Sequence, residues 1–228
     1  MAPRRWFSVV VAVIVIAAGA FAAGYLVHTT TTTTTSTSAP TTTTSAPEPT
    51  WVATWPTASS SLRYTTPTAA ALGFARAVLH MTTPQARAFQ QGDTRSGEVP
   101  IVTSSTGPVT TVLVRQLTSD NSWWVLGSAC AAVNISTPHA LDTVTSPQIL
   151  SGESTAFEAV INYALYQDND TTPLASGTTM GGANGVMGPF NTTLSFSAPT
   201  QRYGVLVVYT LSAKDGSVLE ASAIRVAF

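Results

Sequence analysis

The sequence predicts a mainly β protein in which a C-terminal β-sandwich follows a small α+β unit, a Thr-rich stalk and one N-terminal transmembrane helix. Three observations support this fold class. An uncharged apolar run follows two arginines, a tract of Thr, Ser and Pro comes next, and the remaining chain alternates apolar and polar residues between turns. Only 9% of the 228 residues are charged and the net charge is −1. Because nucleic-acid binding needs a basic surplus, no nucleic-acid partner is expected.

The first element is a predicted transmembrane helix over residues 6–27. This run carries no charge. As a helix it would span roughly 33 Å, which exceeds the hydrocarbon core of a bilayer. Trp6 and Tyr25 lie near its two ends, where amphipathic rings favour the membrane interface. We therefore expect the chain to bind the cytoplasmic membrane through residues 6–27.

Basic residues predict the orientation of this helix. Arg4 and Arg5 precede the run and no Lys or Arg follows before Arg63, so residues 1–5 should stay cytoplasmic and the rest should be exported. A cleaved signal peptide is the alternative, because small residues at positions 18, 20 and 22 offer cleavage sites. The prediction is a single-pass protein of the cell membrane, or a secreted protein if the segment is cleaved, with extracytoplasmic C-terminal domains.

Residues 28–67 are predicted to form a disordered Thr/Ser/Pro-rich stalk. The segment holds few aliphatic side chains and cannot bury enough surface to offset the entropy of ordering. Its prolines favour an extended chain, and such tracts also accept O-linked sugars. Trp51 and Trp55 are unusual in a spacer, which leaves two interpretations open: packing on the folded part, or contact with the envelope.

Residues 68–133 are predicted to hold one helix and about three antiparallel strands. Thr68 is the expected N-cap, and the apolar residues after it at helical spacing are Leu72, Ala75, Val78 and Leu79. The expected strands are 98–103, 109–117 and 123–133. In the middle strand, Val112 and Val114 alternate with Leu113 and Arg115, which predicts one buried and one wet face. So small a unit is expected to dock on the C-terminal part of the chain.

Residues 134–228 are predicted to form a β-sandwich, because short alternating strands recur between Gly, Pro and Asn turns. Asp215 and Gly216 predict a tight hairpin before the last strand. The apolar faces expected in four strands are Phe157, Ala159, Ile161, Tyr163 and Leu165; Phe190, Leu194 and Phe196; Tyr203, Val205, Val207, Tyr209 and Leu211; and Ile224, Val226 and Phe228, with Arg225 out of phase.

This region resembles a known family. The matching features are Ser146-Pro147 before Gly152, a strand opening on Phe157-Glu158-Ala159, Gly188-Pro189-Phe190 before another strand, and the Lys214-Asp215-Gly216 hairpin. Together they resemble the immunoglobulin-like domain of bacterial spore-germination proteins over about residues 135–228. The preceding segment is similar to the one before this domain in exported actinobacterial proteins. The resemblance implies an immunoglobulin-like sandwich with a non-catalytic, extracytoplasmic role in adhesion or protein contact, and it supplies no catalytic residues.

The sequence offers no candidate catalytic residue, cofactor site or metal site. Cys130 lies in an apolar strand without a basic neighbour, so an inert buried thiol is expected. His139 and Asp142 are close in sequence but have no nucleophile to complete a catalytic arrangement. A glycine-rich run at 181–185 lacks the Lys of a phosphate-binding loop and is expected to be an inter-strand loop.

The densest group of carboxylates is at residues 168–172. This segment does not match the calcium-binding loop of an EF-hand, because Pro173 and Thr179 occupy the positions where that motif requires Gly and Glu. A solvated turn in which Asp side chains bind backbone N–H groups is the expected structure, and a looser calcium site is the less favoured alternative.

These observations predict a non-catalytic, membrane-anchored protein of a bacterial envelope whose immunoglobulin-like domain binds a protein or a cell-wall polymer. The alternative is small-ligand binding in a pocket of the 68–133 unit, lined by Trp123, Trp124 and Phe74. An enzyme is disfavoured because no acid–base or metal constellation stands out.

Overall fold

The computed structural model describes residues 53–228. No helix in this part of the chain is long and apolar enough to span a membrane. The predicted membrane span 6–27 and the stalk as far as residue 52 lie outside the described residues. The elements are α1 (Pro67–Ala77), β1 (Gln85–Ala86), β2 (Gln90–Gln91), β3 (Ser96–Val102), β4 (Thr110–Gln116), β5 (Trp123–Cys130), β6 (Val133–Thr137), β7 (Gln148–Ala156), the 3-10 turn η2 (Phe157–Ala159), β8 (Val160–Gln167), β9 (Ala175–Met180), β10 (Gly182–Ala183), β11 (Gly188–Leu194), β12 (Tyr203–Leu211) and β13 (Val218–Ala227).

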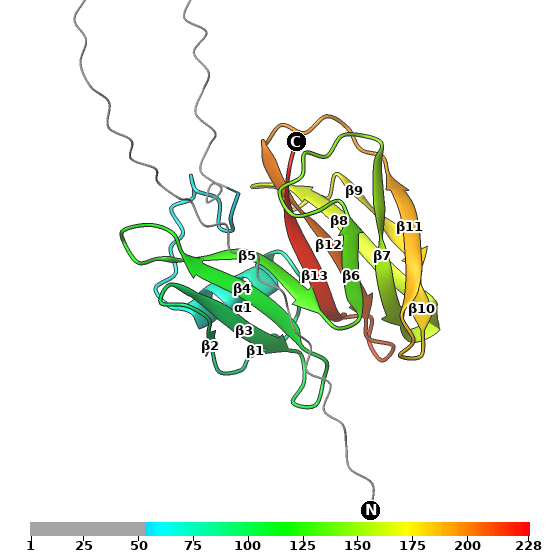
Figure 1. Cartoon of the computed structure of the whole chain (residues 1–228), viewed down its shortest axis with the longest axis horizontal. Coiled ribbons are helices and arrows are strands. Elements are labelled where there is room, and N and C mark those ends of the chain that lie inside the picture. The colour runs from blue at the N-terminus through cyan, green and yellow to red at the C-terminus, as the bar shows by residue number, and fades with distance from the viewer. Residues whose placement is uncertain (1–52) are drawn as a thin grey trace, which may run out of the picture. The chain divides into compact units, whose positions relative to one another are not determined.

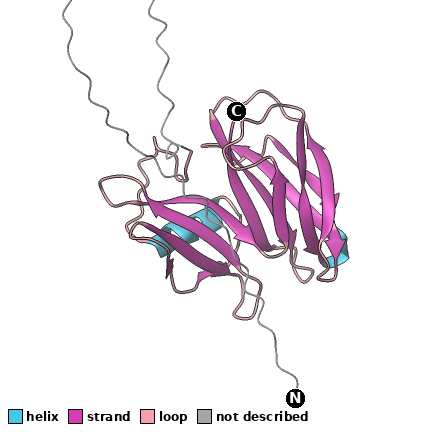
Figure 2. Cartoon of the chain, in the orientation of Figure 1, coloured by secondary structure: helices cyan, strands magenta, loops and turns pink. Residues whose placement is uncertain are grey.

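The strands form one large, almost wholly antiparallel network, and the mainly β prediction is confirmed. A long sheet has the order β1-β3-β4-β5-β13-β12-β8-β9. A second group, in which β6 and β11 flank β7, supplies the other layer of the sandwich. Figure 2 shows the strands in magenta, with α1 as the one α-helix among the described residues. The short β10 runs parallel to β7.

Strand β5 joins the α+β unit to the sandwich (Figure 1). Its C-terminal half pairs with β13 through Ser128 and Gly127. Its N-terminal half pairs instead with the segment before α1, because Trp55 bridges to Val125 and Tyr64 to Trp123. Residues Ala46–Phe228 make up a single compact unit of contacts. The α+β unit is therefore continuous with the sandwich through backbone hydrogen bonds.

Helix α1 begins earlier than its apolar spacing suggests. The Thr66 hydroxyl accepts a hydrogen bond from the Ala69 N–H, and Pro67 occupies the first turn, where its missing N–H costs nothing. The predicted N-cap, Thr68, is therefore wrong. The buried face of the helix consists of Ala70, Ala71, Phe74 and Ala75. Small residues on this face allow α1 to lie close to β3, β4 and β5.

The long sheet is buried on both faces where β12 passes through it. Val205 and Val207 pack in the core under α1, whereas Leu206 and Val208 pack in the core of the sandwich. The predicted phase of β12 is correct, but the opposite face is buried as well and Leu211 is 38% exposed. The alternation predicted for β4 is confirmed, because Val112 and Val114 are buried while Leu113 and Arg115 are exposed.

The end of the predicted stalk is corrected by the structure. Residues 53–67 are not a disordered linker, because Ala53 and Thr54 are buried and Trp55 packs against Tyr64 and Phe74 with ring centroids 5.6 Å apart in each pair. Aromatic contacts of this kind stabilise a segment beyond the area that they bury. Of the two interpretations of Trp55, packing on the folded part is the correct one.

The strand predicted to open at Phe157 is also corrected. Phe157, Glu158 and Ala159 form the tight turn η2, in which Glu158 and Ala159 adopt positive φ angles of 56° and 62°. This turn reverses the phase at Phe157, which is 67% exposed instead of belonging to the core. From Ile161 onward the prediction holds, since Ile161, Tyr163 and Leu165 all pack in the sandwich core.

Candidate functional site

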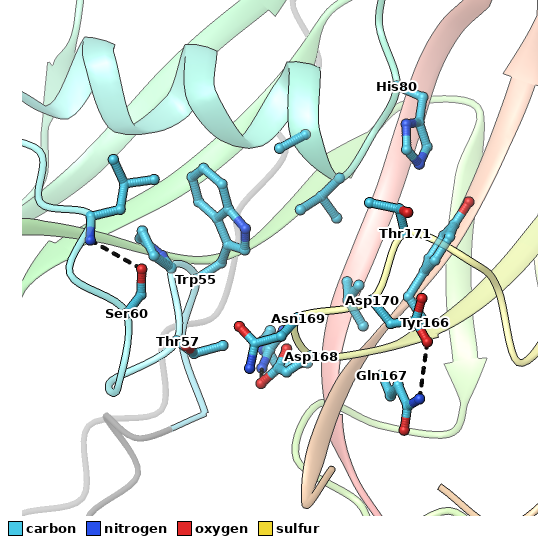
Figure 3. A pocket seen from close by; sticks show the side chains of 16 residues that line it. Trp55, Thr57, Ser60, His80, Tyr166, Gln167, Asp168, Asn169, Asp170 and Thr171 are labelled. Carbon is cyan, nitrogen blue, oxygen red and sulfur yellow. Dashed lines mark hydrogen bonds and ion pairs between the residues drawn. The ribbon is translucent and has the colours of Figure 1, made fainter. Parts of the chain in front are cut away.

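A cavity of about 290 Å³ lies where the segment before α1, the C-terminal end of α1 and strands β8, β12 and β13 meet (Figure 3). Trp55 reaches it from that segment and Tyr166 from β8, and the loop after β8 contributes Asp168 to Thr171. The sequence does not bring these residues together, because their neighbourhood depends on how 53–64 folds against β5.

Arg225 is the buried charge at this cavity. Its side chain is almost fully buried, and its Nη2 lies 2.6 Å from Asp168 Oδ2. Its Nε donates to the Ala53 carbonyl oxygen at 3.2 Å. A charge-assisted pair at this burial is short and strong, and loss of either partner would strand the other charge. Through these two contacts, Arg225 of β13 connects the loop after β8 with the segment before α1.

Aromatic and polar side chains complete the walls. The rings of His80 and Tyr166 lie 5.6 Å apart, and burial raises the pKa of the Tyr166 hydroxyl. Asp170 Oδ1 accepts a hydrogen bond from the Thr172 N–H, which lowers the pKa of Asp170. This contact is the solvated turn expected for 168–172. The arrangement offers hydrogen-bonding groups and ring faces, but Asp168, its partly buried carboxylate, is already paired with Arg225.

A second feature is an exposed apolar surface at one end of the sandwich, formed around η2 and the loop between β9 and β11. We call it the apolar tip. Large apolar side chains gather here with 39–69% of their surface exposed: Phe157, Val160, Met180, Val186 and Met187. Their nearness follows from pairing: Val160 lies opposite Met180, the Gly181 N–H binds the Ala159 carbonyl, and Gly182 pairs with Thr155.

Glycine is required in the loop of the tip. A Cβ at Gly182 would collide with the Val186 carbonyl oxygen, so only glycine allows the chain to fold back this closely. Gly185 follows Asn184, and both have positive φ. The run predicted as an inter-strand loop therefore contains the short strand β10 and a sharp turn. That turn leaves Val186 69% exposed.

Cys130, His139 and Asp142 were considered in the sequence as reactive residues, and none of them lines the cavity of Figure 3. Burial raises the pKa of Cys130 to about 12, so the thiol stays protonated at neutral pH. His139 and Asp142 are both exposed, and the Asp142 carboxylate accepts from the His139 N–H at 2.8 Å. No group of three or more His, Cys, Asp or Glu side chains that could hold a metal ion is found in residues 53–228.

The three aromatic residues predicted to line a ligand pocket of the α+β unit do not do so together. Phe74 and Trp124 are fully buried members of the interior, and Trp123 packs edge-on against Phe89. None of the three lines the cavity of Figure 3, whose tryptophan is Trp55. The features that sequence reasoning missed are the burial of Arg225 and the apolar tip. A usable signal for Arg225 was its phase, which it shares with the small residues Ala221 and Ala223.

Comparison with known proteins supports the assignment of the C-terminal part. Residues 132–217 match the family model described as the immunoglobulin-like domain of bacterial spore germination (Gmad2). The match covers β6 to the turn before β13, which includes every strand of the sandwich except β13. Searches of curated proteins and of solved structures gave no match to the chain.

Proposed function

We propose that this chain, whose residues 132–217 carry the immunoglobulin-like domain of bacterial spore germination, is a non-catalytic, membrane-anchored protein of a bacterial envelope that binds a protein partner through its apolar tip. The domain projects outside the cytoplasm on the N-terminal segment. This proposal rests on the sandwich fold, on the apolar run at residues 6–27 and on the exposed surface around η2.

The exposure of the tip carries the proposal. Large apolar side chains on soluble domains are usually scattered, and contiguous exposed groups of them mark contact surfaces. Here Phe157 of η2, Met180 at the end of β9 and Val186 of the loop after β10 are each exposed by 66% or more. Burial of such side chains against a partner would contribute about 1.5–3 kcal/mol each. A few such side chains can dominate the affinity of an interface.

The tip suits a protein partner better than a sugar polymer. Its exposed groups are aliphatic, thioether and phenyl side chains, which pack against other apolar side chains by excluding water. Met180 and Met187 are flexible and polarisable, so they can adapt to an uneven partner surface. A wall polymer is covered with hydroxyl groups and would leave this surface without matching contacts.

The test is affinity capture from envelope extracts with residues 46–228 as bait, which span the compact unit. A double variant, Phe157→Ser with Met180→Ser, is expected to reduce capture of the specific partner about tenfold or more. The matched control is Ile149→Ser, which changes a side chain that is 48% exposed on β7, outside the tip. Capture that is equal for wild type and the double variant would refute the tip as the binding surface.

A further inference from the structure

Buried polar atoms without a partner gather at one place in the sandwich. Across residues 53–228, five buried side-chain nitrogen or oxygen atoms have no hydrogen-bond partner within the chain: Ser154 Oγ, Thr155 Oγ1, Thr210 Oγ1, Glu220 Oε2 and Arg225 Nη1. Folded proteins pair nearly all such atoms because each unpaired one costs about 1–3 kcal/mol. Thr155, Thr210 and Glu220 line the same cavity, of about 380 Å³. Their clustering indicates a missing common partner.

This cavity adjoins the apolar tip. Phe157 and Leu211 belong to its walls, and Asn184 and Gly185 from the loop after β10 complete it. Glu220 lies opposite Thr210 across the β12–β13 pair. The Glu220 side chain is more than nine-tenths buried, whereas Phe157 and Leu211 are both exposed. A group that enters beside the tip would thus pass apolar walls before it meets the carboxylate.

The cavity contains a negatively charged group without a positively charged side chain in its lining. Its polar side chains are one carboxylate, two hydroxyl groups and the amide of Asn184, and no Lys, Arg or His lines it. Burial raises the pKa of Glu220, while hydrogen bonds from the Ala132 N–H and the Cys130 thiol act in the opposite direction. Neither partner neutralises an ionised carboxylate. The cavity therefore holds a carboxylate, and no positively charged side chain belongs to its lining.

A primary ammonium group supplies what is missing. It carries one positive charge and three N–H donors, and the Glu220 carboxylate and the hydroxyl oxygens of Thr155 and Thr210, residues of the cavity lining, can each accept. The methylene stem of a lysine suits apolar walls, since lysine side chains bury their stems and keep only the head in polar surroundings. A calcium ion would need six to eight oxygen ligands, and the described lining holds only one carboxylate.

We propose that the cavity lined by Glu220, Thr155 and Thr210 receives the ammonium group of a lysine side chain on the protein partner. This inference rests on the proposed function, because it supplies the polar anchor of the contact whose apolar part is the tip. The charge complementarity and the direct continuity with Phe157 both favour this occupant. The bound lysine would pair the Glu220 carboxylate and hold it ionised.

The experiment uses the full-length chain in detergent micelles and two small probes. Nα-acetyl-lysine-N-methylamide carries the ammonium group, and Nα-acetyl-norleucine-N-methylamide has a similar stem without it. The chain has five glutamates, so the carboxyl resonances of a glutamate-labelled sample can be assigned by single substitutions. The lysine probe is expected to shift the Glu220 resonance and lower the pKa of this residue, whereas the norleucine probe leaves both unchanged.

Two variants test the contact. Glu220→Gln is expected to weaken binding of the lysine probe about tenfold or more, because a charge-assisted hydrogen bond contributes about 1.5–3 kcal/mol. Thr210→Val removes one acceptor but keeps the charge, so a smaller loss is expected. The matched control is Glu158→Gln, an exposed carboxylate of η2 that does not line the cavity. Circular dichroism of each variant checks the fold.

The outcomes separate the two proposals. Equal binding of both probes, or unchanged affinity in Glu220→Gln, would overturn the ammonium site. If the Phe157 and Met180 double variant captures less partner but Glu220→Gln captures as much as wild type, the lysine contact is refuted and the tip remains the binding surface. If neither variant reduces capture, the proposed function itself is wrong. Loss in both, together with selective binding of the lysine probe, supports the two proposals together.

Discussion

At the scale of single residues, two buried charges on β13 have opposite surroundings. Arg225 finds a carboxylate at 2.6 Å and a backbone carbonyl, so its charge is paired, although its Nη1 has no partner within the chain. Glu220 has no cation beside it in the cavity that it lines. A buried ion pair can at best offset the loss of hydration, whereas an unpaired buried carboxylate opposes folding whenever it is ionised. Loss of the Arg225 charge should therefore lower the free energy of unfolding, whereas loss of the Glu220 charge should raise it.

The stability of the protein should depend on pH through Glu220. Because burial raises the folded-state pKa above the ordinary value of 4.5, the folded protein binds a proton that the unfolded chain has released. The contribution of Glu220 to the free energy of unfolding is therefore complete below about pH 4 and is lost as pH rises through the raised pKa. Glu220→Gln should match wild type in stability at pH 4 and exceed it at pH 8.

Urea denaturation at the two pH values measures this difference. Glu158→Gln serves as the control because its carboxylate is exposed in η2. A gain in stability for Glu220→Gln that is equal at pH 4 and pH 8 would contradict the assignment, since a side-chain packing effect does not titrate. Addition of the lysine probe at pH 8 should reduce the difference in the free energy of unfolding between Glu220→Gln and wild type. The ammonium group pairs with the carboxylate, which only the wild type has.

At the scale of elements, the segment before α1 decides whether the α+β unit is complete. Backbone hydrogen bonds link Trp55 with Val125 in both directions, at 3.0 and 2.7 Å, and the Trp123 N–H donates to the Tyr64 carbonyl at 2.8 Å. The segment occupies the part of the β5 edge that β13 leaves free. It behaves as an irregular edge strand, although its composition is that of a spacer.

A chain that starts at Thr68 should accordingly be less stable than one that starts at Ala46. It loses the Thr66 cap of α1, the packing of Trp55 on Phe74 and the partner of the Arg225 Nε. Removal of one large aromatic side chain from a core already costs about 3–5 kcal/mol, and a similar or larger loss is expected here. Equilibrium denaturation of the two purified fragments measures it, and equal midpoints would show that residues 46–67 add nothing.

Much of the element-level prediction came from periodicity, and its errors have local causes. The alternation in β4 and the hairpin at Gly216 were predictable, since both depend on neighbours in sequence. Phe157 was placed in the core because its spacing from Ile161 is even, which ignores the possibility of a turn. Two successive residues with positive φ broke that phase, and no sequence pattern at Glu158 or Ala159 signals them. The tip could therefore not be predicted.

At the scale of the whole molecule, β5 explains how a small α+β unit is stabilised. The core of the α+β unit also contains Val205, Val207, Ala221 and Ala223 from β12 and β13. The unit is therefore stabilised by apolar surface that it buries together with the sandwich. The continuity of the sheet also implies that the tip and the cavity of Figure 3 belong to one compact unit. We expect that unit to act as a single rigid head.

The proposed anchor makes a prediction for the intact protein in its native host. If residues 6–27 span the membrane, full-length protein should sediment with membranes, resist extraction by carbonate and be released by detergent. Mass spectrometry of that fraction should contain the peptide that spans Trp6, and external protease should cleave within the stalk. A soluble form in the medium whose N-terminus begins after residue 20 or 22 would instead identify a cleaved signal peptide.

Composition and periods of two and 3.6 residues along the chain were sufficient to predict the mainly β class and the order of the α+β unit and the sandwich, because these properties depend on residues close in sequence. These patterns predicted the sandwich and the helix of the α+β unit, and the resemblance stated for about residues 135–228 agrees with the family match at residues 132–217. The burial of Arg225 and Glu220, the position of the apolar tip and the pairing of residues 53–67 with β5 became visible in the folded structure. These features arise from contacts between residues far apart in sequence, such as Arg225 with Ala53 and Glu220 with the cavity beside Phe157.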